Sequence, residues 1–141
     1  LRLKPALVVV VLVNVVAAAF FALSFRLYPD LRASYSGIHH WQRWVMILLL
    51  PISAAFCEEL IWRGYIPAQL KLRGRTDRRI LVISSLSFAL IHGIFLWDKL
   101  LMTFLIGIIA GRYVLKEKSL LPVMAAHWLM DAWSFAFFLF A

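Results

Sequence analysis

The sequence predicts an all-α, polytopic bundle of about five membrane-spanning helices. Of its 141 residues, 64% are hydrophobic and 16% are charged, whereas roughly 45–50% apolar residues are typical of soluble domains. Several apolar runs are long enough to cross a bilayer core of about 30 Å, which takes roughly 20 helical residues. Since no run alternates apolar and polar residues, and backbone in lipid must satisfy its own hydrogen bonds, helices are favoured over strands.

We place the expected spans near residues 6–25, 44–66, 80–97, 100–115 and 119–141. The first is expected to be a membrane anchor, and 44–141 to hold the helices that carry the chemistry. The absence of a sequence repeat or low-complexity linker indicates one domain, 1–141. Pro51 should kink the second span about two turns before Glu58, and Pro67 should help to end that helix.

Basic residues divide unevenly between the two ends of such a bundle. The N-terminus and the loops near 63–79 and 112–118 hold eleven of the fifteen Lys and Arg residues. This asymmetry predicts a cytoplasmic N-terminus and an outside C-terminus, and it accounts for the net charge of +8 without nucleic acid. The small size favours a multi-pass protein of a prokaryotic plasma membrane.

Isolated polar or small residues in the runs predict packing contacts. Asn14 is expected to form a hydrogen bond to another helix. Gly107 and Gly111 are four residues apart, which lets helix backbones approach, first within the chain and second in a homodimer. The segment 24–43 predicts an interfacial loop with aromatic anchors.

Ionisable residues inside the runs need a reason, because each charge in a bilayer costs several kcal/mol unless it is paired or wetted. Glu59 and Arg63 are four residues apart and share a helix face, so they can neutralise each other. Glu58 points about 100° away and must find its partner on another helix. The full set is Glu58, Glu59, Arg63, His92, His127 and Asp131.

These groups are predicted to converge on one cavity. At a rise of about 1.5 Å per residue, the carboxyl and imidazole groups lie at overlapping depths of about 12–18 Å from the expected cytoplasmic ends. A packing network needs far fewer charges than this. Such a set suits water activation, in which a carboxylate or imidazole takes a proton from water and other donors stabilise the oxyanion.

Three ordered motifs, each inside an expected span, resemble the CPBP family of membrane proteins. The family, also called ABI, comprises CAAX proteases and bacteriocin-processing proteins and includes the Rce1-type prenyl-protein endopeptidases. The motifs are Glu58-Glu59-x-x-x-Arg63, Phe88-x-x-x-His92 and His127-x-x-x-Asp131. The resemblance covers about residues 54–133 and implies an intramembrane glutamic peptidase without a cofactor, in which the Glu59–Arg63 pair shapes the site.

The resemblance also implies roles for the other residues. Glu58 and His92 would activate the hydrolytic water, and His127 with Asp131 would bind the carbonyl oxygen or orient that machinery. Because an ionised Asp131 cannot donate to an oxyanion, it would instead hold the His127 imidazole in the useful tautomer. The implied substrate is a lipidated, CAAX-like or membrane-tethered protein, or a sorted or secreted peptide.

Two other functions stay open at this point. The same His, Glu and Asp side chains are suitable Zn²⁺ ligands for a membrane metallopeptidase, although no His-Glu-x-x-His motif supports one. A non-enzymatic immunity protein, scaffold or small transporter would use the cluster as a lock or relay. We favour the glutamic peptidase because catalysis needs Glu58 free of Arg63, whereas a lock does not.

Overall fold

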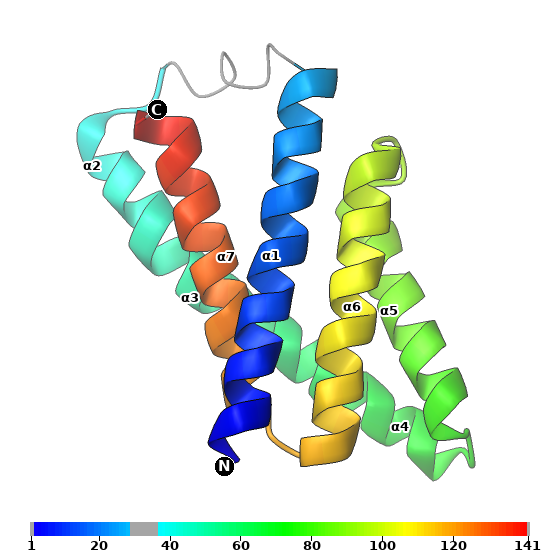
Figure 1. Cartoon of the computed structure of the whole chain (residues 1–141). Helices are drawn as coiled ribbons and strands as arrows, with labels where there is room; N and C mark the ends of the chain where they lie inside the picture. The colour runs from blue at the N-terminus through cyan, green and yellow to red at the C-terminus, as the bar shows by residue number, and fades with distance from the viewer. Residues whose placement is uncertain (1, 29–36, 141) are drawn as a thin grey trace.

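The computed structural model describes residues 2–28 and 37–140, and within these ranges the chain is helical without a strand (Figure 1). Five helical stretches follow one another up and down the bundle, which confirms the predicted all-α fold. The first stretch is α1 (Leu3–Leu27). The second stretch is continuous and comprises α2 (His40–Trp44), η2 (Val45–Leu49), α3 (Leu50–Glu59), η3 (Leu60–Tyr65) and α4 (Ile66–Leu72). The remaining three are α5 (Asp77–Gly93), α6 (Trp97–Glu117) and α7 (Leu121–Phe140).

Three stretches of the described chain are long and apolar enough to cross a membrane by length and composition: Leu3–Leu27, His40–Leu72 and Leu121–Phe140. The other two correspond to expected spans but differ in character. Helix α5 has only 17 residues, and α6 carries charged residues near both of its ends. These two helices pack side by side and complete the bundle (Figure 1).

The second stretch passes both of its prolines, so the prediction that Pro67 helps to end this helix was wrong. A π-helical segment precedes each proline: Leu50 N–H donates to Val45 O, and Ile66 N–H donates to Ile61 O. These wider turns accommodate the backbone hydrogen bond that a proline cannot make. The stretch therefore continues to Leu72 and crosses behind the other helices (Figure 1).

The expected loop 24–43 is shorter than predicted on both sides. Helix α1 continues to Leu27 and α2 begins at His40, while residues 29–36 lie outside the described residues. Arg43 fixes the start of the second stretch, because its Nη1 donates to Leu139 O at 2.8 Å. The end of α7 thus holds α2 in place.

Asn14 makes the interhelical hydrogen bonds expected of it. Its Nδ2 donates to Ala126 O at 3.3 Å, and its Oδ1 accepts from Trp133 Nε1 at 2.8 Å. Both partners are in α7, so one polar side chain fixes α1 against the helix that carries His127.

The glycines of α6 lie against α5, as expected for packing within the chain. A Cβ atom on Gly107 would lie 2.9 Å from Ser85 Cβ and 3.0 Å from Ser85 Cα, and one on Gly111 would lie 2.8 Å from Leu81 Cδ1. Close contact of the two helices therefore requires glycine at 107. A homodimer through this face stays a prediction and would require α5 to be displaced.

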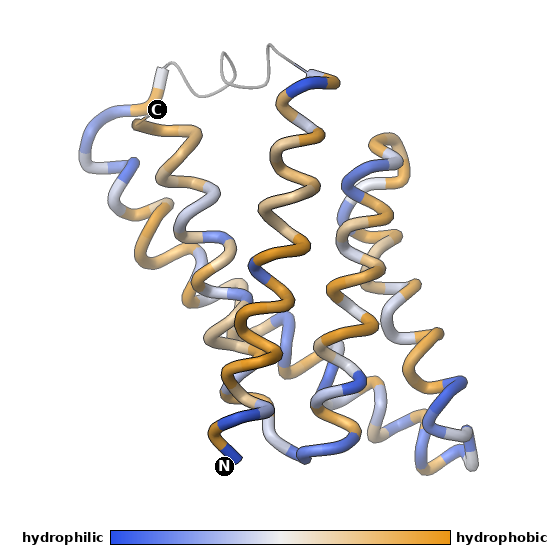
Figure 2. The backbone as a smooth tube through the Cα atoms, viewed as in Figure 1, coloured by the Kyte–Doolittle hydropathy of each residue, from blue (hydrophilic) through white to orange (hydrophobic). Residues whose placement is uncertain are grey.

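The chain ends and connections separate into two groups. The N-terminus, the α4–α5 turn and the α6–α7 connection lie at one end of the bundle, and the C-terminus and the α5–α6 turn lie at the other (Figure 1). Hydrophilic residues mark the first end clearly (Figure 2). The predicted grouping of the basic loops is confirmed, whereas the compartment that each end faces stays a prediction.

Candidate active site

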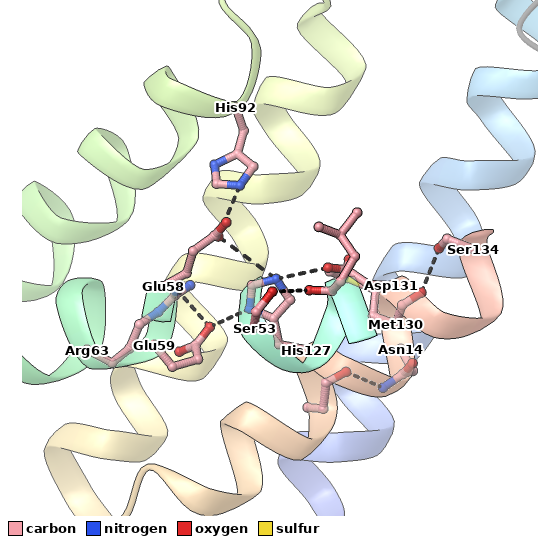
Figure 3. Close-up of polar contacts among 12 residues, drawn as sticks. Asn14, Ser53, Glu58, Glu59, Arg63, His92, His127, Met130, Asp131 and Ser134 are labelled. Atoms are coloured by element: carbon pink, nitrogen blue, oxygen red, sulfur yellow. Dashed lines mark hydrogen bonds and ion pairs between the residues drawn. The ribbon is translucent and has the colours of Figure 1, made fainter. Parts of the chain in front are cut away.

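Three helical stretches bring the predicted polar residues together in one cluster (Figure 3). The second stretch contributes two adjacent carboxylates at the end of α3 and a guanidinium in η3, α5 contributes an imidazole at its last turn, and α7 contributes an imidazole and a carboxylate. In chain order these are Glu58, Glu59, Arg63, His92, His127 and Asp131. Their arrangement has a sealed inner layer and a partly open outer layer.

The inner layer consists of Glu59, Arg63 and His127, with side chains only 2%, 3% and 8% exposed. Glu59 Oε1 accepts from Arg63 Nη1 at 3.0 Å, which confirms the expected ion pair. The same oxygen lies 2.9 Å from His127 Nδ1. One carboxylate oxygen therefore joins the cation of its own helix to the imidazole of α7.

The outer layer consists of Glu58, His92 and Asp131, whose side chains are 30%, 22% and 25% exposed. Glu58 Oε2 lies 3.2 Å from His92 Nε2 and 3.9 Å from His127 Nε2. The expectation that the partner of Glu58 comes from another helix is confirmed. Glu58 lies between the two imidazoles (Figure 3).

The surroundings of His92 constrain where its protons are. Its Nδ1 lies 2.7 Å from Phe88 O, and a carbonyl oxygen only accepts, so Nδ1 carries a hydrogen. A neutral ring would then direct the Nε2 lone pair at a carboxylate oxygen of Glu58. The close approach of the two groups therefore favours an imidazolium beside a carboxylate, and it is an ion-pair contact without a hydrogen bond, since Glu58 Oε2 has no hydrogen-bond partner among the described residues.

The tautomer of His127 is set mainly by Glu59, although this role was expected of Asp131. The Nδ1 atom faces Glu59 at 2.9 Å, whereas Asp131 Oδ2 lies 3.5 Å from Nε2. Because an ionised carboxylate only accepts, Nδ1 donates to Glu59, and Nε2 is directed at the open side of the cluster. Asp131 thus lies beside the atom of His127 that faces the outer layer.

Phe88 is part of the site in a way that the motif spacing did not show. The Arg63 Cζ atom lies 4.0 Å from the centroid of the Phe88 ring, a cation–π contact in a buried setting. The same ring lies 4.3 Å from the ring of His92. The only sequence signal was the four-residue spacing from His92, which gives a shared face but not a partner.

Within the described residues, no group of three or more His, Cys, Asp or Glu side chains is arranged to hold a metal ion. Cys57, next to Glu58, has an exposed side chain. The expected absence of a cofactor stays a prediction.

A family model described as type II CAAX prenyl endopeptidase, Rce1-like, matches residues 40–133, more than half of the chain. The chain belongs to this family. Neither a search of curated proteins nor one of solved structures gave a significant match. The resemblance drawn from the three motifs is thereby confirmed, and all six cluster residues lie inside the matched range of the Rce1-like family.

Membership in the Rce1-like family implies a peptidase of the CAAX type that works inside the membrane. Together with its apolar helices, it makes this chain an integral membrane protein. Helix α1 precedes the matched range and packs on α6 and α7.

Proposed function

We propose that this protein is a glutamic endopeptidase of the membrane that cleaves a prenylated protein near its C-terminus. The observation that carries the proposal is the Glu58–His92 pair, whose Oε2 and Nε2 atoms lie 3.2 Å apart on the open side of a buried polar layer. A carboxylate that a cationic neighbour on its own helix does not neutralise is able to accept a proton from water.

The proposed reaction starts with a water beside Glu58 and His92. Glu58 takes one proton as the water oxygen attacks the scissile carbonyl carbon, which gives a tetrahedral oxyanion. The His127 Nε2 atom, held in place through Nδ1 by Glu59, donates to this oxyanion when it carries a proton, and Asp131 positions or shares that proton. His92, as the imidazolium, then gives its Nε2 proton to the leaving amine as the carbon–nitrogen bond breaks, and it takes the proton from Glu58 in its place, which restores the starting state of the pair.

Glu59 is unsuited to the role of base, although it is adjacent to Glu58. Its Oε1 atom already accepts from Arg63 and His127, and its side chain is sealed from the open side. We assign Glu59 and Arg63 to positioning: they hold the His127 ring and neutralise each other inside the bundle.

The substrate class rests on the family and on the surroundings of the cluster. The helices around it expose large apolar side chains, among them Ile52, Phe56, Ile61 and Ile91. An isoprenoid on the substrate would be solvated by the bilayer and hold the peptide at the depth of the site, which favours proximity. A CAAX sequence places that lipid on a cysteine close to the bond to be cleaved.

The test is a cleavage assay with the purified protein in lipid bicelles. The probe is a peptide that ends in a farnesylated cysteine followed by three residues, and mass spectrometry identifies the products. We expect release of the terminal tripeptide by the wild type, with or without a strong chelator. His92→Ala should abolish the release, while His40→Ala, at an exposed position of α2, should retain it.

Each component of the proposal has its own contradicting result. Turnover by His92→Ala at the wild-type rate would remove the water-activating pair. Activity that is lost in chelator and restored by Zn²⁺ would assign the hydrolysis to a metal. Equal cleavage of the same peptide without the farnesyl group would overturn the proposed substrate class.

A further inference from the structure

A groove of about 520 Å³ lies between α5 and α6 at the end of the bundle that holds the N-terminus. Its lining consists of three cationic side chains and one carboxylate, together called the rim, and two leucines. The lining residues are Asp77, Arg78, Leu81, Arg112, Leu115 and Lys116. The groove lies on the outer surface of the bundle and is separate from the polar cluster.

The charge of the groove is not balanced within the described part of the chain. Asp77, its only carboxylate, is already engaged by Lys71, whose Nζ lies 2.5 Å from Asp77 Oδ1. None of the three cations on the rim forms an ion pair with a described residue. The rim therefore has a surplus of positive charge from Arg78, Arg112 and Lys116.

Apolar side chains continue from the rim toward the middle of the bundle. On α5, the steps of four residues that follow Arg78 are Val82, Leu86 and Leu90, and all three are exposed. On α6, the turns that precede Arg112 present exposed side chains at Leu105 and Leu101. Figure 2 shows the same change along α5 and α6, from hydrophilic at this end to apolar above it.

This combination indicates the class of ligand. A soluble anion would contact only the rim and gain nothing from the apolar stripes. A basic pocket between helices at a membrane surface, with apolar helix faces leading away from it, has the chemistry that binds an anionic headgroup and its acyl chains. We propose that the α5–α6 groove binds an anionic phospholipid, with the phosphate among Arg78, Arg112 and Lys116 and the acyl chains along the apolar stripes.

The test measures binding of defined lipids to the purified protein in detergent by native mass spectrometry. We expect phosphatidylglycerol to bind more tightly than phosphatidylcholine. Each basic residue near a membrane surface contributes about fivefold in affinity, so Arg112→Gln with Lys116→Gln should weaken phosphatidylglycerol binding by roughly 25-fold. The matched control, Arg73→Gln with Arg75→Gln, removes the same charge from the α4–α5 turn and should change binding less than about threefold.

The other outcomes contradict the proposal. Equal losses in the two double variants would show attraction to overall charge without a site. Equal affinity for both lipids would remove the role of the anionic headgroup. Competition by inorganic phosphate as effective as that by phosphatidylglycerol would assign the rim to a soluble anion. If the double variant is misfolded by circular dichroism, the single substitutions Arg112→Gln and Lys116→Gln replace it, each with an expected loss of about fivefold.

Discussion

The two layers of the polar cluster differ in burial, and this difference separates two adjacent glutamates. In the inner layer, Glu59 is sealed and accepts from both Arg63 and His127. In the outer layer, Glu58 is partly open and lies 3.2 Å from His92. Two residues of the same type, one position apart on one helix, thus have different surroundings.

In this bundle the reactive carboxylate of Glu58 is supported by a second set of charged groups that does not react. Arg63 in the inner layer compensates the charge of Glu59, and Glu59 in turn fixes one nitrogen of His127. The outer layer then keeps the carboxylate of Glu58 and the imidazole of His92 within 3.2 Å of each other. We expect the inner layer to control stability and the outer layer to control turnover, and the following experiments test this division.

The largest effect on stability is expected from Arg63→Met. Removal of one partner leaves Glu59 buried without its cation, which costs roughly 3–5 kcal/mol for a buried pair. Glu58→Gln, in the outer layer, should cost less than about 1 kcal/mol. The measurement is the free energy of unfolding of both variants in mixed micelles of dodecyl maltoside and SDS. Equal costs would contradict the division between the layers.

Gly107→Ala is expected to destabilise the protein by roughly 1–3 kcal/mol, the usual cost of overpacking. The added methyl group would meet Ser85 backbone at 3.0 Å, so α5 must move. His92 lies on α5 about two turns away, and turnover should fall as well. Gly111→Ala is the matched control and should lower the free energy of unfolding less. Its methyl group would contact only the end of the Leu81 side chain, which can move. The same cost for both variants would show that backbone contact at Ser85 is unimportant.

Asn14→Ala should cost about 1 kcal/mol, the typical contribution of a hydrogen bond between membrane helices. It removes the hydrogen bonds to Ala126 O and Trp133 Nε1 that connect α1 to α7. Val15→Ala, at the next position but exposed, is the control, with little change. The unfolding assay in mixed micelles measures the free energy of unfolding of both variants. If Asn14→Ala has the same free energy of unfolding as the wild type, α1 is held by apolar packing alone.

The smallest effect concerns the turn between α4 and α5, where the hydrogen bond from Lys71 holds the pKa of Asp77 below its usual range. A carboxyl with a lowered pKa stabilises the fold at pH values above its ordinary pKa, and this contribution disappears as the pH falls through the lowered value. Asp77→Asn should therefore be slightly less stable than the wild type at neutral pH, and the difference should close on acidification. The midpoint of thermal unfolding across that pH range checks this, and a difference that grows in acid would contradict it.

The helical fold was predictable from the sequence because the backbone of an apolar run in lipid must satisfy its own hydrogen bonds, and a helix does so within one run. It did not predict that the second stretch passes Pro67. A proline removes one hydrogen bond, and whether a helix stops or adopts a wider π-helical turn depends on the neighbouring helices, which the local pattern does not contain.

The site was predictable within each helix and less so between helices. A spacing of four residues gave the Glu59–Arg63 pair and placed His127 and Asp131 on one face. The contacts of Glu59 with His127 and of Arg63 with Phe88 depend on how α3 and η3 are rotated against α7 and α5. Helical spacing does not fix that rotation, so the double role of Glu59 emerged only from the structure.

The most direct test of Glu58 as the catalytic base is the single-turnover cleavage rate of Glu58→Gln, with Cys57→Ser as the neighbouring control. Glutamine keeps the size of the side chain but cannot take a proton from water. We expect the rate of Glu58→Gln to fall by at least about 10²-fold with unfolding nearly unchanged, while Cys57→Ser cleaves at the wild-type rate. A folded Glu58→Gln protein that cleaves the farnesylated peptide as fast as the wild type would contradict the central role of Glu58.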